Sequence, residues 1–171
     1  MEVILAAAAV TVLLFVWVSW TATRVDRLHD RTSLARTSLD AQLVRRAAAL
    51  QALASDSAAE LGPQREQRLL ALATASLDAN ESTREAVEND LSRALRATPA
   101  GADPALLADL TDAARRVALA RRFYNDAVRD TRSLRRRRLP RLFRLGGAQP
   151  LPAFFEIDDT LPVPARQETQ R

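Results

Sequence analysis

Residues 106–134 read LLADLTDAARRVALARRFYNDAVRDTRSL and decide the fold. Their apolar and small side chains recur at alternating spacings of four and three, a pattern that lines one face of a helix and packs against neighbouring helices. Asp103 precedes the stretch as a candidate helix cap, and Pro104 stands where a missing N–H costs nothing. The sequence therefore predicts a long helix over residues 103–138. The positions of this a/d seam are Leu106, Leu110, Ala113, Val117, Ala120, Tyr124, Ala127, Thr131 and Leu134.

Two stretches nearer the N-terminus carry the same spacing. Residues 24–61 form one seam, in which Arg46 is a charged member, and residues 64–97 form another with several polar members. Gly62-Pro63 and the segment 99–104 interrupt the pattern between the stretches. Because such short connections force antiparallel neighbours, we expect an all-α fold, an antiparallel bundle of three long helices. A short helical turn over 139–145 and an extended tail complete it.

The composition supports this fold and excludes several kinds of site. The chain has 171 residues, enough for one domain, and aromatic residues make up only 5% of it, which favours helix over sheet. It has no Cys and only His29, so thiolate chemistry, Cys-based zinc sites and multi-His metal sites are excluded. Glu81, Glu85 and Glu88 share a helix face, but no Glu-x-x-His pair accompanies them, and we interpret them as a solvated acidic face. We therefore expect no catalytic residues, no metal and no cofactor.

The N-terminus carries an unbroken apolar run. Val3 to Thr23 is a stretch of 21 residues without a charge, long enough to cross a hydrocarbon core, and Trp17 and Trp20 lie near its end, as is typical of a membrane interface. A cleaved signal peptide is disfavoured, because Glu2 replaces the usual basic residues and no A-x-A site follows. A buried core helix is disfavoured by the length of the run. The sequence predicts a transmembrane anchor over residues 1–23.

The charges that flank the anchor predict its orientation. Arg24, Arg27 and Arg31 follow the apolar run directly, whereas only Glu2 and the amino terminus precede it. The positive-inside rule then places residues 24–171 in the cytoplasm. We expect a single-pass protein of the cell membrane that contacts lipid through its N-terminal helix.

A dense arginine segment follows the last predicted helix. It holds seven of the 25 basic residues, and without it the remaining 18 basic and 21 acidic residues would leave a net charge of −3. One interpretation is an anion site for an acidic protein, lipid headgroups or nucleic acid. The other, which we favour, is a helix terminus neutralised by Glu156, Asp158 and Asp159 folding back. The segment comprises Arg132, Arg135, Arg136, Arg137, Arg138, Arg141 and Arg144.

The number of predicted helices indicates where the arginine segment lies relative to the membrane. Three helices would leave the arginines about 50 Å from the bilayer, which makes the protein's own membrane their least expected ligand. Glycines and prolines then end helical structure, and Phe154, Phe155 and Ile157 are expected to pack back on the bundle. The predicted domains are thus an anchor over 1–23, a bundle with its tail over 24–159, and a disordered terminus over 160–171.

The segment 117–129, VALARRFYNDAVR, resembles the signature of the LemA family of bacterial membrane proteins. LDAQLVRR at 39–46 resembles the family's first-helix pattern, and Phe154-Phe155-Glu156 resembles its aromatic–acidic tail, so the likeness covers residues 1–159. AAALQAL at 47–53 departs from the family pattern, as does the RRRR of residues 135–138. The resemblance implies an antiparallel bundle on an N-terminal anchor with no established enzymatic activity. The residues that match the family motif are Arg122, Phe123, Tyr124, Asn125 and Val128.

These observations lead to three functional hypotheses, of which a bundle enzyme is the least expected, because the sequence offers no acid–base or metal constellation. The first is a membrane-anchored scaffold or adaptor for an unidentified protein partner, without catalysis. The second is an anion-binding module whose segment from Arg132 to Arg144 engages nucleic acid or an acidic partner, although nucleic acid is the less expected of the two. Homo-oligomerisation stays open. Tyr124 lies on the seam, so its ring should be buried and its hydroxyl should need a partner, which is a structural role. The Arg- and Ala-rich, Lys-free composition suggests a bacterial source.

Overall fold

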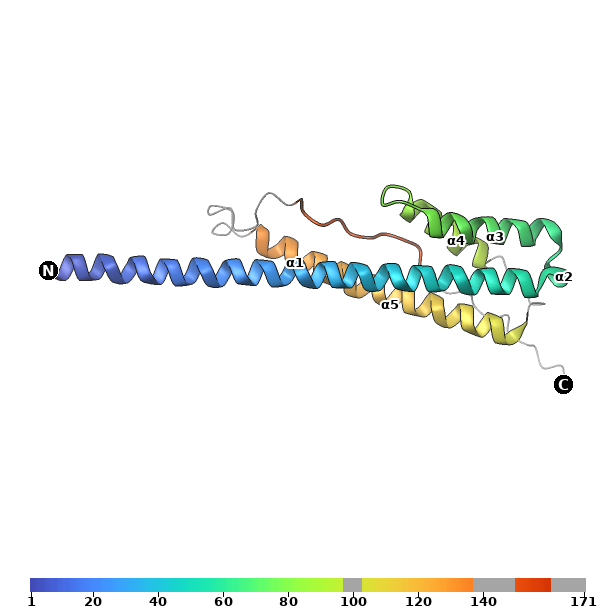
Figure 1. Ribbon diagram of the computed structural model, residues 1–171, viewed down its shortest axis with the longest axis horizontal. Coiled ribbons are helices and arrows are strands. Elements are labelled where there is room, and N and C mark those ends of the chain that lie inside the picture. The colour runs from blue at the N-terminus through green and yellow to red at the C-terminus, as the bar shows by residue number, and fades with distance from the viewer. Residues whose placement is uncertain (97–102, 137–149, 161–171) are drawn as a thin grey trace. The chain divides into compact units, whose positions relative to one another are not determined.

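The protein is all-helical over the residues that its computed structural model describes, which are 1–96, 103–136 and 150–160. The expected fold class is therefore confirmed, while the expected number of helices is wrong. The helices, drawn in Figure 1, are α1 (Glu2–Asp56), α2 (Ala58–Leu61), α3 (Pro63–Asp78), α4 (Arg84–Arg96) and α5 (Pro104–Arg135).

The chain divides into two compact units. The first comprises Met1–Arg36 with Phe123–Phe154, and the second comprises Thr37–Arg122 with Phe155–Arg171. The long helices α1 and α5 each contribute one part to either unit, so neither unit is a continuous piece of chain.

The second unit holds a core to which all five helices contribute. Its side chains are Leu and Ala, whose modest size allows the helices to pack closely. Each fully buried Leu contributes on the order of 1.5–3 kcal/mol to the free energy of folding. The core members are Leu50, Leu53 and Ala54 of α1, Leu61 of α2, Leu69 and Ala73 of α3, Leu91 and Leu95 of α4, and Leu110 of α5.

The expected single helix over 64–97 is in fact a hairpin of α3 and α4. Ala79 adopts an extended conformation after α3, with φ −64° and ψ 128°. The side-chain oxygen of Asn80 then accepts the backbone N–H groups of Ser82 and Thr83, at 3.0 and 3.1 Å. Asn is favoured in this capping role because its amide oxygen replaces missing helical hydrogen bonds. This local turn overrides the weak seam that suggested a continuous helix.

Two other predicted boundaries are confirmed, whereas the stretch expected as one helix over 24–61 is interrupted at Ser57, between α1 and α2. Gly62 closes α2 with a φ of +77°, a conformation that favours glycine, and Pro63 begins α3. At the start of α5, the Asp103 carboxylate accepts the N–H groups of Ala105 and Leu106, at 2.7 and 3.3 Å. These helix boundaries therefore depend on the residues that stand at them, as the sequence predicted.

The first unit pairs α1 with the C-terminal part of α5 in antiparallel orientation. The guanidinium of Arg36 lies over the ring of Tyr124, 5.5 Å from its centroid. Farther toward the N-terminus of α1, the hydroxyl oxygens of Thr32 and Thr131 are 3.0 Å apart. A residue later in α5 thus contacts a residue earlier in α1, as two antiparallel helices require.

The N-terminal part of α1 is helical from Glu2 and displays apolar side chains. Ile4 is 74% exposed and Phe15 is 72% exposed. Among the described residues, α1 is the one helix long and apolar enough to cross a membrane, and none of its most apolar window is buried inside the molecule. The helix continues unbroken to Asp56, as expected for an anchor joined directly to the bundle.

Candidate functional site

Tyr124, the centre of the family-like motif, fastens three segments of the first unit. Its side chain is 5% exposed, and its hydroxyl donates a 2.8 Å hydrogen bond to the carbonyl of Ala153 in the tail. The Arg36 guanidinium covers the ring from α1. The predicted burial of the ring is confirmed, and the partner that the hydroxyl needs is a backbone carbonyl of the tail.

The remaining motif residues divide between the interior and the surface. Val128 is fully buried and Asn125 is half-buried. Arg122 is exposed, and Phe123 is 59% exposed although it directly precedes the buried Tyr124. The motif therefore contains an aromatic side chain that the fold does not use for packing.

The second unit contains a buried ion pair that the sequence interpretation missed. Arg46 of α1 is 2% exposed and Glu88 of α4 is fully buried, and a guanidinium N–H of Arg46 donates to a Glu88 carboxylate oxygen. The hydroxyl of Ser76 donates to the other carboxylate oxygen at 2.7 Å. Arg46 also donates to the hydroxyl of Ser92 at 3.3 Å. The pair thus joins α1, α3 and α4 through polar contacts within an apolar core.

Arg84 completes this cluster from the first turn of α4. Its guanidinium donates to the carbonyl of Ser76 at 2.5 Å and lies 4.0 Å from Glu88. Two arginines therefore face one carboxylate. Because removal of one partner from a buried pair leaves an uncompensated charge, the cluster selects one arrangement of the three helices. Arg46 and Glu88 are buried in the core, and we interpret the cluster as structural.

The interpretation of Glu88 as part of a solvated face is wrong. Glu81 is exposed and Glu85 is half-buried, and the carboxylate of Glu85 accepts the backbone N–H of Glu156 at 2.9 Å. The signal for the buried pair was available in the sequence, because Arg46 occupies a seam position between leucines. A charge placed there requires an acid on a facing helix.

The arginine segment starts at the end of α5, where the tail contacts it. Arg132 is half-buried, donates to the carbonyl of Pro152 at 2.7 Å, and lies 4.9 Å from the ring centroid of Phe154. Arg135 donates to the carbonyl of Pro150 at 3.3 Å, and Arg136 is exposed. The remaining members, Arg137, Arg138, Arg141 and Arg144, lie outside the described residues, as does the helical turn expected over 139–145.

The expected neutralisation of this segment by Glu156, Asp158 and Asp159 stays a prediction, because Arg137, Arg138, Arg141 and Arg144 lie outside the described residues. Both aspartates belong to the second unit, where Asp158 pairs with Arg96 and Asp159 with Arg121, each at 2.6 Å. Hydrogen bonds from the hydroxyl and backbone N–H of Thr160, followed by the bond from Arg96, lower the pKa of Asp158 to about 2. Asp158 and Asp159 therefore hold the end of the tail within the second unit.

The apolar tail residues behave as expected. Phe155 is 3% exposed and Ile157 is 8% exposed, so both are buried, and Phe154 is half-buried under Arg132. Thr160, which was assigned to the disordered terminus, is hydrogen bonded to Asp158. Residues 161–171 of that terminus lie outside the described residues.

The expected position of the arginine segment far from the apolar stretch is also wrong. In the first unit, the hydroxyl of Thr131 lies 3.4 Å from the carbonyl oxygen of Leu28, only five residues after Thr23. The reason is the α3–α4 hairpin, because two helices in place of one let α5 return toward the start of the chain.

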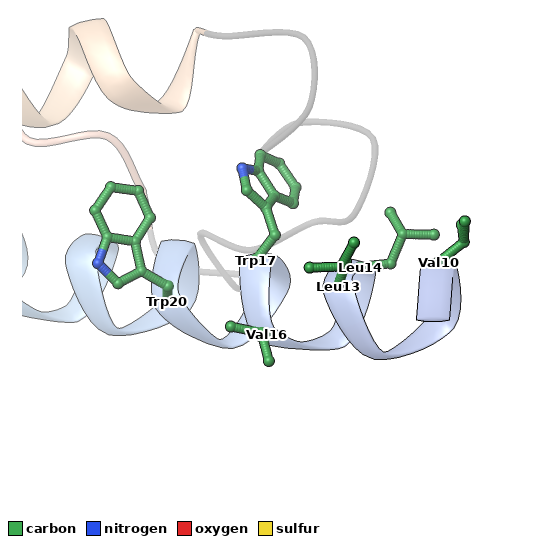
Figure 2. Close-up of a pocket in the computed structure, with 6 residues that line it drawn as sticks. All are labelled: Val10, Leu13, Leu14, Val16, Trp17 and Trp20. Atoms are coloured by element: carbon green, nitrogen blue, oxygen red, sulfur yellow. The ribbon is translucent and has the colours of Figure 1, made fainter. Parts of the chain in front are cut away.

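A hollow of about 610 Å³ lies along the apolar part of α1. Figure 2 shows the two indole rings projecting from the same side of the helix. The named lining residues carry no charge, so nothing among them would orient a polar ligand. Within the described ranges, moreover, no group of three acidic or His side chains could hold a metal ion. The residues that line the hollow are Val10, Leu13, Leu14, Val16, Trp17 and Trp20.

Over its described residues the protein is thus all-helical, with one candidate membrane-spanning helix and a polar network buried between α1, α3 and α4. Comparisons with protein-family models, with curated proteins and with solved structures find no match to this chain.

Proposed function

We propose that this protein is a single-pass, membrane-anchored helical bundle of the LemA type, which acts as a scaffold or adaptor for protein partners and performs no catalysis. The observation that carries the proposal is α1, which runs from an exposed apolar stretch into the buried core without a break. The bundle lies in the cytoplasm of a bacterial cell, on the side of the membrane that the arginines after the span prefer.

The exposure of the apolar stretch supports its insertion in lipid. Val3 is 81% exposed and Leu13 is 68% exposed, and a soluble protein rarely displays so long an apolar surface. A bilayer removes this surface from water while the helix satisfies its own backbone hydrogen bonds. The bundle is thereby joined to the membrane through continuous helix.

Phe123 is the residue that we assign to partner binding. Exposed aromatic side chains are enriched at protein interfaces, where a single buried ring can supply much of the binding energy. The ring of Phe123 is 59% exposed, whereas its neighbour Tyr124 is held by the tail and by Arg36. The fixed backbone around Tyr124 presents Phe123 in a defined position.

Site-specific photo-cross-linking in intact membranes tests this assignment. A photoreactive residue at position 123 should capture one discrete protein, and the same residue at Leu77, which is 40% exposed on α3, serves as the matched control. Phe123→Ser, combined with a photoreactive residue at the nearby exposed position 122, should lose the capture. Equal capture at positions 123 and 77, or capture that persists in Phe123→Ser, would contradict a partner site at Phe123.

Anion binding by the arginine segment is the second candidate function. The specific observation in its favour is that Asp158 and Asp159, two of the acids expected to neutralise the segment, pair with Arg96 and Arg121. Nucleic acid as the ligand would produce an association that weakens steeply with salt. A titration of the purified chain with duplex DNA at increasing salt concentration tests this candidate.

A further inference from the structure

The C-terminal end of α5 lies beside the part of α1 that directly follows the apolar stretch. The hydroxyl of Thr131 contacts that of Thr32 at 3.0 Å and the carbonyl of Leu28 at 3.4 Å. Because the two helices are antiparallel here, Arg135 and Arg136 lie closer to the apolar stretch than Thr131 does. All of these residues belong to the first unit, which also contains the apolar stretch itself.

The two adjoining helix segments are strongly basic. Residues 24–31 and 126–136 together contain seven arginines and four aspartates, a net charge of +3. Two ion pairs involve these segments, Arg31 with Asp130 and Arg129 with Asp126, and in each pair both side chains are exposed. Exposed pairs of this kind are weak and screened by salt, so they exchange readily for other anions. The arginines are Arg24, Arg27, Arg31, Arg129, Arg132, Arg135 and Arg136.

The arginine geometry suits phosphate. Arg132 donates its Nε–H to the neutral carbonyl of Pro152 and stacks near the ring of Phe154, which positions the guanidinium without cancelling its charge. A guanidinium presents its remaining N–H groups as a planar fork that matches phosphate oxygens. Two of the tail acids, Asp158 and Asp159, pair with Arg96 and Arg121 within the second unit.

The depth of these residues relative to a bilayer follows from α1. Trp17 and Trp20 lie at the end of the apolar stretch, where indole rings mark the membrane interface, and Arg24 lies 5.6 Å from the ring centroid of Trp20. At 1.5 Å rise per residue, residues 24–31 extend only roughly 12 Å beyond the stretch. The headgroup layer with its phosphates occupies roughly the first 5–8 Å of this distance.

We propose that the end of α5 and residues 24–31 of α1 form a basic collar, comprising the seven arginines named above, that binds anionic phospholipid headgroups of the membrane holding α1. The inference rests on the proposed membrane anchor and adds to it a second attachment of the bundle. Its ligand is the lipid surface, and charge complementarity with an anionic leaflet selects lipid over the other anions considered.

Full-length protein in lipid nanodiscs provides the test, because both faces of a nanodisc are accessible and membrane orientation has no influence. The chain has no Cys, so Ser133→Cys, at an exposed position on α5, accepts a single fluorophore. Quenching by a headgroup nitroxide lipid then reports contact of the collar with the surface. We expect stronger quenching in nanodiscs containing phosphatidylglycerol than in pure phosphatidylcholine, and its reversal by added salt.

A charge-matched pair of variants isolates the collar. Glutamine at four exposed collar positions should weaken docking by roughly fivefold per arginine, the factor that corresponds to about 1 kcal/mol each. Glutamine at four exposed arginines elsewhere should leave docking unchanged. The collar variant replaces Arg24, Arg27, Arg129 and Arg136, which avoids the tail contacts of Arg132 and Arg135, and the control variant replaces Arg45, Arg93, Arg115 and Arg116.

The outcomes separate the collar from the anchor on which it rests. Equal quenching in nanodiscs of both lipid compositions would contradict lipid binding by the collar, and so would an equal loss of docking in both variants. Neither result would contradict the membrane anchor. Failure of the wild-type chain to enter phosphatidylcholine nanodiscs overturns both. Binding of duplex DNA that depends on the collar arginines, with no response to phosphatidylglycerol, would assign the collar to nucleic acid. If the collar variant unfolds, the salt dependence of wild-type quenching decides.

Discussion

At the scale of single residues, the most consequential side chains are charged ones inside the core. Arg46 and Glu88 are both buried and form an ion pair with each other. A buried pair of this kind contributes little net stability compared with apolar residues, yet loss of one partner is severe. Its value to the protein is specificity, since only one packing of α1, α3 and α4 brings the two charges together.

Glu88→Ala should lower the free energy of unfolding by about 3–5 kcal/mol, because Arg46 would remain buried without a counter-charge. The double change Arg46→Met with Glu88→Leu should recover most of that loss, since an apolar pair fills the same volume. Urea unfolding of the full-length chain in detergent measures both. The exposed Glu81→Ala is the control and should stay within about 0.5 kcal/mol of wild type. A Glu88→Ala variant as stable as Glu81→Ala would show that the pair is not buried.

The Tyr124–Phe123 pair gives a second prediction at this scale, because neighbouring aromatic residues have opposite exposure. Tyr124→Phe should cost about 1–2 kcal/mol of unfolding free energy, since the Ala153 carbonyl loses its donor. Tyr124→Ala should cost about 3–5 kcal/mol, because it also leaves a cavity. Phe123→Ala, at a ring that is 59% exposed, should change stability by less than about 0.5 kcal/mol. Equal effects at the two positions would contradict the burial of Tyr124.

At the scale of elements, a short tail without regular structure is held by side chains that flank it. Phe155 and Ile157 are buried, the N–H of Asp158 donates to the Asn89 amide at 2.7 Å, and its carboxylate pairs with Arg96. The apolar anchors supply most of the attachment, because exposed ion pairs are weak. The polar contacts set the register of the tail.

The attachment of the tail should depend on acidic pH through Asp158. Its pKa is about 2 in the folded chain against an ordinary value of 3.8, so the contribution of the carboxylate is fully present above about pH 4. It is lost as the pH falls through 2, where the folded carboxyl becomes protonated. Hydrogen exchange of residues 150–160 should therefore accelerate over that range in wild type more than in Asp158→Asn.

Asp112→Asn is the matched control for this experiment. The pKa of Asp112 is also lowered, chiefly by its hydrogen bond from Arg116, but Asp112 lies on α5 and does not contact the tail. The exchange profile of the tail in Asp112→Asn should follow that of wild type. An Asp158→Asn tail with the same pH response as wild type would remove Asp158 from the attachment.

At the scale of the whole molecule, the two parts of the long helix α1 suit two different surroundings. Its first part displays apolar side chains at every angle, and its second part buries one face in the bundle core. A helix that is apolar all round is suited to lipid, whereas an amphipathic one is suited to a bundle surface. The change of pattern along one uninterrupted helix is therefore the main argument for a membrane anchor.

The full-length chain should stay in the membrane after a carbonate wash, and residues 24–171 should not. Leu13→Arg with Phe15→Arg should release it, because each charge at the centre of a span costs about 2.5–3.5 kcal/mol. Leu34→Arg, at a position 71% exposed beyond the apolar stretch, is the control and should be retained. Mass spectrometry should find Met1 or Glu2 at the N-terminus of the retained protein. A mature chain that begins after Thr23 would make the stretch a cleaved signal.

Local chemistry by itself determined the helical class, the caps and the apolar stretch. Asp103 and Pro104 begin α5, and Gly62 and Pro63 separate α2 from α3, because these residues act on their own backbone neighbours. The burial of Tyr124 also followed from its seam position. Such features need no knowledge of distant parts of the chain.

Only the tertiary structure decided which charges meet. The division of 64–97 into α3 and α4 depends on a short turn at Asn80 that competes with a weak seam. That hairpin changes the direction in which α5 runs, and so brings Thr131 and the first arginines of the segment beside Leu28. Arg46, Arg96 and Arg121 lie 42, 62 and 38 residues from the acids with which they pair, Glu88, Asp158 and Asp159. Charge pairing over such separations depends on how the helices fold back, and residue spacing does not encode it.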